Sequence, residues 1–239
     1  MYFEHDAEMW RDFPALVPGV LFAAGITSDV AVDSRIIPFT ERAEARLANA
    51  TESELPEIQA WRRAFAAMGL KPTQYRCASE SLLRRFRKEG TLPRLHPLVD
   101  LCNAISLAYA IPVAVFDAAK IAGHVRVQRA AGDEKYLTFS GETEQPPAGE
   151  VIFADEAGQA HARRWTNRQS AASAVRDTTS GALIVAEALH TTAAADITEL
   201  TAAIGRELDA VWQIRSAGTV LTSRSPRFSF AAELPHHGA

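Results

Sequence analysis

A polar row runs through an otherwise apolar stretch, "HPLVDLCNAISLAYA", which carries Asp100, Asn103 and Ser106 at steps of three. Residues three apart are neighbours on a helix, so these side chains would form one polar strip. The amide of Asn103 can donate and accept hydrogen bonds, as binding of an amino acid's polar groups or a ribose hydroxyl requires. We therefore expect Asn103 to bind a ligand. Asp100 is expected to accept backbone N–H groups or pair with an arginine, and Ser106 to pack.

Four more side chains could contact a substrate. Glu134, in the turn "AGDEKY", could bind an α-ammonium group or position a water, although a strand-edge salt bridge is an equally good interpretation. Arg168 could bind a phosphate or an ester carbonyl through two hydrogen bonds, or it could be an exposed charge at a strand end. Its neighbour Asn167 is a further candidate, and Thr178 could offer a hydroxyl or simply form a turn. A catalytic role is open to Asn103, Glu134 and Arg168, and the sequence assigns it to none of them.

Two runs of the chain are strongly basic. Residues 62–94 hold nine Lys or Arg against two Glu, and residues 161–176 hold four Arg, no acid and Trp165. Acids elsewhere in the fold could balance these charges. Arginine-rich surface with an interleaved aromatic is also what phosphate binding and base stacking require. We favour RNA binding, and the candidate contacts are Arg76, Arg84, Arg85, Arg87, Lys88 and Arg164.

The composition limits the classes of protein to consider. The chain has 239 residues, 47% hydrophobic and 23% charged, which is ordinary for a globular protein with a sizeable core. It has no run of eighteen apolar residues, and its start, "MYFEHDAEMW", does not resemble a signal peptide, so we expect a cytoplasmic protein that spans no membrane. Cys77 and Cys102 form no CxxC pair, which indicates buried thiols in a reducing compartment. We expect no metal site, no cofactor, and neither DNA nor a membrane as partner.

The periodicity predicts helices first and strands later, hence one α+β domain over residues 1–239, with helices covering a mixed, mostly antiparallel sheet. The tail with His236 and His237 is expected to be disordered. Helices are predicted near 40–50, over 55–69 and 73–90, from Pro97, and over 193–213, and strands within 15–26, 123–131, 134–141, 149–158, 161–167 and 181–189.

Several of these segments, taken in order, resemble the editing and tRNA-binding module (B domain) of the phenylalanyl-tRNA synthetase beta chain. "HPLVDLCN" followed by "IPVAVFD" is similar to that family's Asn-Pro-Val-Val-Asp-Val-Thr-Asn and its later Met-His-Ala-Phe-Asp. "RVQRAAGDEKYLTFSG" and "AVRDTTSGALIVAEA" also resemble the module, and the core of the resemblance covers residues 72–186. The free-standing version of the module is especially similar, in "YRCASESLLRR", "LPRLHPLVDLCN", "PAGEVIFAD" and "RRWTNRQ".

The resemblance implies the module's fold and a trans-acting editing factor that binds tRNA and hydrolyses mischarged aminoacyl-tRNA, without being an aminoacylating ligase. Of the family's pocket residues, the asparagine falls on Asn103, the threonine becomes Cys102 and the histidine becomes Ala114. The family's glutamate would fall near residues 170–172, where this chain has no acid. Two alternatives stay open. One is a non-catalytic module that binds tRNA or a free amino acid, and the other is a hydrolase of small amino-acid esters or amides.

Overall fold

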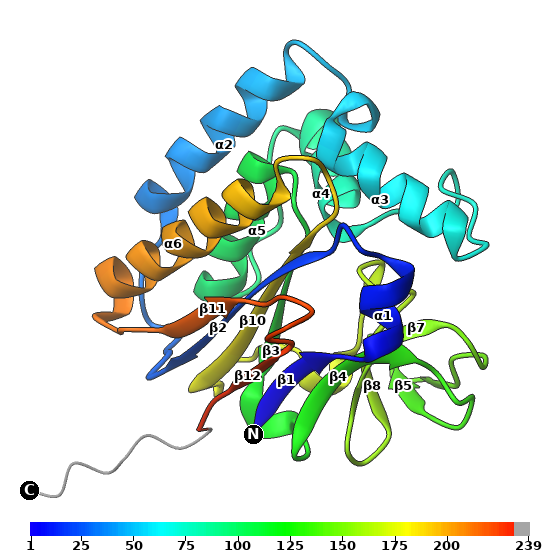
Figure 1. Ribbon diagram of the computed structural model, residues 1–239. Coiled ribbons are helices and arrows are strands. Elements are labelled where there is room, and N and C mark those ends of the chain that lie inside the picture. Colours follow the sequence, from blue (N-terminus) through cyan, green and yellow to red (C-terminus); the bar gives the residue numbers. More distant parts are fainter. Residues whose placement is uncertain (232–239) are drawn as a thin grey trace, which may run out of the picture.

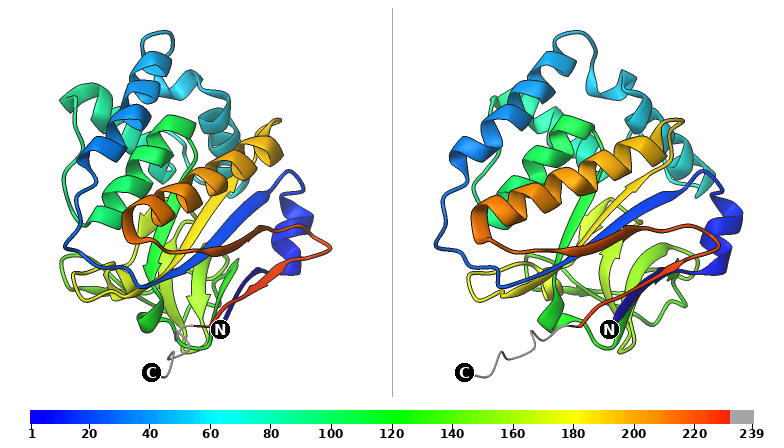
Figure 2. Two further views of the ribbon diagram at one scale, coloured as in Figure 1. Left: turned by 90° about the vertical axis from the view of Figure 1, so that its left-hand side faces the viewer. Right: turned by 60° about the vertical axis from the view of Figure 1, so that its left-hand side comes forward.

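The computed structural model describes residues 1–231, so His236 and His237 lie outside the described residues. The chain forms three layers, in which a four-stranded sheet lies between a layer of helices and an eight-stranded sheet (Figures 1 and 2). The helices are α1 (Ala7–Asp12), α2 (Asp33–Leu47), α3 (Pro56–Ala67), α4 (Ala78–Glu89), α5 (Pro97–Tyr109) and α6 (Ala193–Trp212), with short 3₁₀ turns η1 (Glu52–Glu54), η2 (Ala118–Lys120) and η3 (Ala171–Ser173).

The central sheet is antiparallel and has the order β11 (Ala217–Val220), β2 (Val17–Ala24), β10 (Gly181–Ala188), β3 (Val113–Asp117). Every residue of β10 is buried because both faces of this strand are covered. Successive side chains of a strand point to opposite faces. Accordingly, Leu183 and Val185 pack toward the second sheet, whereas Ile184 and Ala186 pack against the helices. This double burial explains why β10 is a continuous apolar run in the sequence.

The second sheet is mixed, because β1 pairs with β4 and β5 pairs with β8 in parallel, while the other pairs are antiparallel. Its strands are β12 (Arg227–Ser229), β1 (Tyr2–His5), β4 (His124–Arg129), β7 (Val151–Asp155), β8 (Gln159–Arg163), β5 (Lys135–Leu137) and β6 (Thr143–Glu144), in that order, with β9 (Arg168–Gln169) paired to β8. Strands β1 and β12, from the two ends of the described chain, thus pair with each other, and β1 also pairs with β4 from its middle.

Helices α2, α5 and α6 lie together on the outer face of the central sheet (Figure 1). Helix α6 approaches β2 closely at Gly19. A Cβ atom there would lie 2.5 Å from Thr201 and 2.7 Å from Ile197, so this contact requires glycine. Helix α5 begins at Pro97, which suits the first turn of a helix, and His96 caps it. Within the described residues, no helix is long and apolar enough to cross a membrane.

The predicted α+β class with a mostly antiparallel arrangement is confirmed, but two stacked sheets replace the single sheet that we expected. The five main helices are present, and α2 begins earlier than predicted, at Asp33. The predicted strand over 161–167 ends at Arg163, because Arg164 and Trp165 adopt positive φ angles of 48° and 57° and turn the chain. Six strands were not predicted, and each of them has five residues or fewer: β1, β3, β6, β9, β11 and β12.

Candidate functional site

A cleft of about 680 Å³ runs along helix α5. One wall comes from the start and middle of α5, another from the start of β3, and the rest from the segments around Phe139 and 174–178. Its size is in the range of small-molecule and cofactor sites. Among the residues that line it are His96, Asn103, Phe139, Gln169, Arg176 and Thr178.

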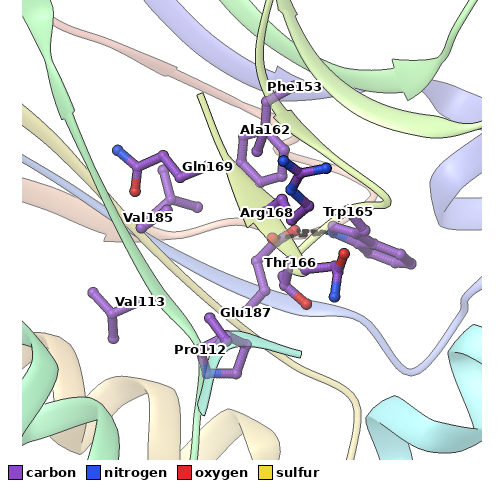
Figure 3. Close-up of a pocket in the computed structure, with 13 residues that line it drawn as sticks. Pro112, Val113, Phe153, Ala162, Trp165, Thr166, Arg168, Gln169, Val185 and Glu187 are labelled. Carbon is purple, nitrogen blue, oxygen red and sulfur yellow. Dashed lines mark hydrogen bonds between the residues drawn. The ribbon is translucent and has the colours of Figure 1, made fainter. Parts of the chain in front are cut away.

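A smaller recess of about 50 Å³ adjoins the cleft (Figure 3 shows the recess). Val113 and Gln169 line both spaces. Its walls are mainly apolar, with Pro112, Phe153 and Val185 among them. The polar groups of the recess come from Thr166 to Gln169 on one side and from Glu187 of β10 on the other. The side-chain amide of Gln169 donates to the Val115 carbonyl at 2.7 Å, which fixes this residue at the boundary between the two spaces.

A strained turn positions the polar side of the recess. Positive φ is uncommon for residues other than glycine and costs conformational energy. Trp165 is nevertheless held in this conformation, since its ring is fully buried and packs edge-on against Trp61 at 4.9 Å and Phe13 at 4.8 Å. The turn therefore delivers Thr166 to Gln169 to the recess in one fixed arrangement.

A buried carboxylate forms part of the recess wall. Glu187 accepts hydrogen bonds from the indole N–H of Trp165 at 3.0 and 3.1 Å, and its Oε1 lies 2.6 Å from His5 Nε2 (Figure 3 shows the Trp165 contact). Burying a carboxylate is costly unless it is paired, and these two partners offset that cost. The sequence analysis missed Glu187, although a single acid inside the apolar run of β10 was a usable signal.

The structure brings four of the predicted substrate-binding residues to this region. Asn103 and Thr178 line the cleft, and Asn167 and Arg168 line the recess. Within residues 1–231 the Asn103 amide has no hydrogen-bond partner, so its donors and acceptor are available. In contrast, the Asn167 amide donates to the Arg76 carbonyl at 2.7 Å, and Arg168 lies 3.6 Å from Glu144.

Glu134 lies apart from the cleft and the recess. Its carboxylate accepts backbone N–H bonds from Ala131 at 2.9 Å and Gly132 at 3.0 Å. Burial opposes ionisation, but these hydrogen bonds outweigh it and hold the pKa of Glu134 below its ordinary value. We correct our expectation accordingly: Glu134 stabilises a turn and is left out of the proposed site.

The remaining members of the polar row have structural contacts. Asp100 accepts the Leu95 N–H at 2.9 Å and lies 3.9 Å from Arg94, as expected for a residue that supports the fold. Ser106 is fully buried and donates to the Ile111 carbonyl at 2.6 Å. Cys102 is buried away from the cleft, while Ala114, at the family's histidine position, lines the recess.

A Ser-His-Asp chain of hydrogen bonds links η3 to strands β7 and β8 of the second sheet. Ser173 Oγ is 2.8 Å from His161 Nδ1, and His161 Nε2 is 3.1 Å from Asp155. Ser173 and His161 have no exposed surface, and Asp155 also accepts the Ala122 N–H at 3.0 Å. Nucleophilic catalysis needs a serine that a substrate can reach, so this chain of hydrogen bonds serves to hold strands and turns together.

One group of potential metal ligands occurs among the described residues, namely Glu57, His190 and Asp196. Arg46 already donates to both carboxylate oxygens of Glu57, at 2.7 and 2.8 Å. His190 Nε2 lies 2.7 Å from Asp196. Because the arginine supplies the positive charge that a cation would bring, we assign no metal here.

Carboxylates offset more of the positive charge of the two basic runs than the sequence of those runs indicated. The carboxylate of Glu52, which is outside the first run, lies 3.1 Å from Arg87 and 3.7 Å from Arg84. Glu80 pairs with Arg62 at 2.5 Å and with Arg76 at 3.4 Å. Arg85 pairs with Glu89, and Arg164 with Glu150. Glu52 and Glu150, which lie outside the two runs, thus supply part of the balancing charge, as the alternative interpretation expected, whereas Glu80 and Glu89 belong to the first run itself. The RNA contacts of these residues stay a prediction.

Comparison with known proteins identifies the family. A model described as "B3/4 domain" matches residues 60–203, more than half of the chain. The phenylalanine–tRNA ligase beta subunit of Cereibacter sphaeroides is 31% identical over 93 residues, which cover 39% of this chain and 11% of that subunit. The beta subunit of Pasteurella multocida is 25% identical over 142 residues, 59% of this chain and 17% of that subunit. An N-terminal fragment of the beta subunit from Pyrococcus horikoshii aligns in structure with a TM-score of 0.44 and 9% identity, over 92% of this chain and 54% of the fragment.

The matched region contains the elements that build the site. Residues 60–203 include α5, β3 and β10 and the strained turn after β8. This chain spans less than a fifth of the length of the two curated beta subunits. The predicted homology to the beta-chain module of phenylalanyl-tRNA synthetase is confirmed, and the chain belongs to the B3/4 domain family.

Proposed function

We propose that this protein is a trans-acting editing factor, which binds the acylated end of a tRNA in the cleft and hydrolyses the mischarged amino-acid ester. The observation that carries the proposal is the Asn103 side chain, which lines a cleft of about 680 Å³ and has no hydrogen-bond partner within residues 1–231. A side chain that only supports the fold would be expected to use its hydrogen-bonding groups internally, as Asp100 does.

The proposed reaction depends more on the correct positions of the ester and of the attacking water than on an acidic or basic side chain. Water adds to the ester carbonyl, the resulting tetrahedral intermediate collapses, and the ribose oxygen leaves and takes up a proton. The neighbouring ribose hydroxyl can orient the water, and Asn103 can hold the ester in place, which is a contribution through orientation. Asn167 and Arg168 stand at the adjoining recess, where developing negative charge could be stabilised.

A second candidate is a non-catalytic module that binds tRNA or a free amino acid through the same cleft. Ala114 favours it, because this residue lines the recess at the position of the family's histidine and offers no proton-transfer group. The two candidates share the binding step and differ only in turnover.

A deacylation assay separates the two candidates. One tRNA, charged in turn with each of several amino acids, is incubated with substoichiometric protein and compared with a no-protein control. Multiple turnovers above the control for at least one amino acid are expected from the editing factor. Saturable tRNA binding with no turnover for any amino acid would refute catalysis and support the binding module. Turnover of free amino-acid esters but not of charged tRNA would instead support the small-molecule hydrolase.

A further inference from the structure

A second hollow lies in the helix layer, between α2, the end of α4 and the connector that leads to α5. We call it the α2 groove; its volume is about 210 Å³, and residues 90–94 of the connector form one side of it. Of the residues that line the α2 groove, only Asn103 also lines the cleft. The volume is below the usual range for drug-sized ligands, so the groove suits a smaller molecule.

Much of the lining of the α2 groove is apolar. Ile36 and Phe86 are buried there, whereas Ile37 is 52% exposed. Leu92 and Pro93 of the connector add further apolar surface. Covering an exposed apolar side chain is favourable in proportion to the area removed from water. The groove therefore favours a ligand with an apolar body.

The polar groups that α2 adds to the groove accept hydrogen bonds but do not donate them. Thr40 and Glu44 are four residues apart and lie on one face of the helix. The Thr40 hydroxyl donates to the Ile37 carbonyl at 2.9 Å, so its oxygen is left to accept. Within residues 1–231, no Lys, Arg or His nitrogen lies within 4.0 Å of the Glu44 carboxylate. This end of the groove thus suits a donor, and a cation best.

The arginine in the lining does not supply that positive charge. Arg94 pairs with Asp33 and lies 3.9 Å from Asp100. Asp33 precedes Glu44 by eleven residues, or about 16 Å along α2, so Arg94 is held toward the other end of the groove. Three carboxylates and one guanidinium line the groove, which leaves a net charge of −2 there.

We propose that the α2 groove binds a small primary amine, whose ammonium group lies at Thr40 and Glu44 and whose apolar body lies against Ile37 and Leu92. An ammonium group has three donors and no acceptor, which matches the two side chains of α2. A free amino acid and an amine without a carboxylate share this chemistry, and the experiment below distinguishes them. The proposal is independent of the editing reaction, because binding in the groove requires neither RNA nor turnover.

The test is a two-dimensional NMR titration of the ¹⁵N-labelled full chain with three probes of one carbon skeleton. 3-Methylbutylamine carries the ammonium group, 3-methylbutan-1-ol has a hydroxyl in its place, and L-leucine has an added carboxylate. The amine is expected to bind with a Kd of about 1 mM and to shift the amide signals of Ile37, Thr40 and Leu92. The alcohol is expected to bind about tenfold more weakly, because it lacks the charge.

Two variants of α2 isolate the contribution of Glu44. Glu44→Gln is expected to raise the Kd for the amine by about tenfold. Glu41→Gln is the matched control, because it removes the same charge from an exposed position of the same helix that does not line the groove, and it should bind like the parent. Both changes are at exposed side chains, so both variants should melt as the parent does.

L-Leucine identifies the source of the ligand: a Kd similar to that of the amine supports a free amino acid, and a much higher Kd supports an amine without a carboxylate. The proposal is overturned if the alcohol binds as tightly as the amine, or if the two glutamine variants bind the amine equally well. It is also overturned if the shifted signals centre on Phe139 and Arg176 of the cleft. An absence of turnover in the deacylation assay changes none of these results, so failure of the proposed function and failure of the groove are distinguishable.

Discussion

Replacement of Asn103 by alanine tests the central assignment. The amide makes no hydrogen bond within residues 1–231, and α5 keeps its apolar face without it. Alanine is also the better helix former, by about 0.5 kcal/mol. The free energy of unfolding should therefore stay the same or rise slightly, which corresponds to an increase in Tm of about 1–2 °C for a chain of this size.

The functional effect should be large by comparison. A hydrogen bond that orients the substrate contributes about 1.4 kcal/mol, so kcat/KM for deacylation should fall by about tenfold or more. Should the protein prove non-catalytic, the same loss is expected in affinity for the acylated RNA end. Asp100→Asn is the matched control, because Asp100 supports the backbone at Leu95 and should lose stability while the folded protein keeps its activity. A variant Asn103→Ala that melts several degrees lower and remains as active as the parent would refute the assignment.

Three further predictions concern other parts of the molecule. Glu134→Gln should destabilise the protein above pH 4.5, the ordinary pKa of a glutamate. The difference from the parent should shrink as the pH falls through the lowered folded pKa, and urea unfolding at several pH values measures this, with unchanged activity as the sign of a structural role. Burial raises the pKa of Cys77 and Cys102 to about 12, so both thiols should resist a disulfide reagent in the native protein and react once it is unfolded; rapid native reaction would contradict their burial. Replacing Arg84, Arg85, Arg87 and Lys88 together by alanine should weaken tRNA affinity and flatten its salt dependence, and an unchanged salt slope would remove α4 from the interface. Because that variant also leaves the buried Glu52 carboxylate without Arg84 and Arg87, Lys88→Ala alone is the control that separates affinity from stability.

The correct predictions of the helices and of the family came mainly from local sequence patterns. In α3, α4, α5 and α6 one helix face is buried. Apolar residues therefore recur every three or four positions along these segments of the sequence. The polar row of α5 was also interpretable, because a helix fixes the relation between neighbours three residues apart. The order of the short motifs was enough to predict the family, since that resemblance depends on local sequence alone.

The sequence by itself therefore determined the main helices, several strands of each sheet, among them β2 and β10 of the central sheet, and the family, because each of these is encoded in residues close together in the chain. Only the tertiary structure decided that there is a second sheet, which side chains line the recess, and which acids pair with the arginines of the basic runs. Glu187 and His5 meet across 182 residues, and Glu52 neutralises arginines that lie in a separate segment. No periodic signal marks such pairs, since their approach depends on the path of the whole chain. The same holds for the cleft, where α5 brings Asn103 and the folding of distant turns adds Phe139 and Arg176.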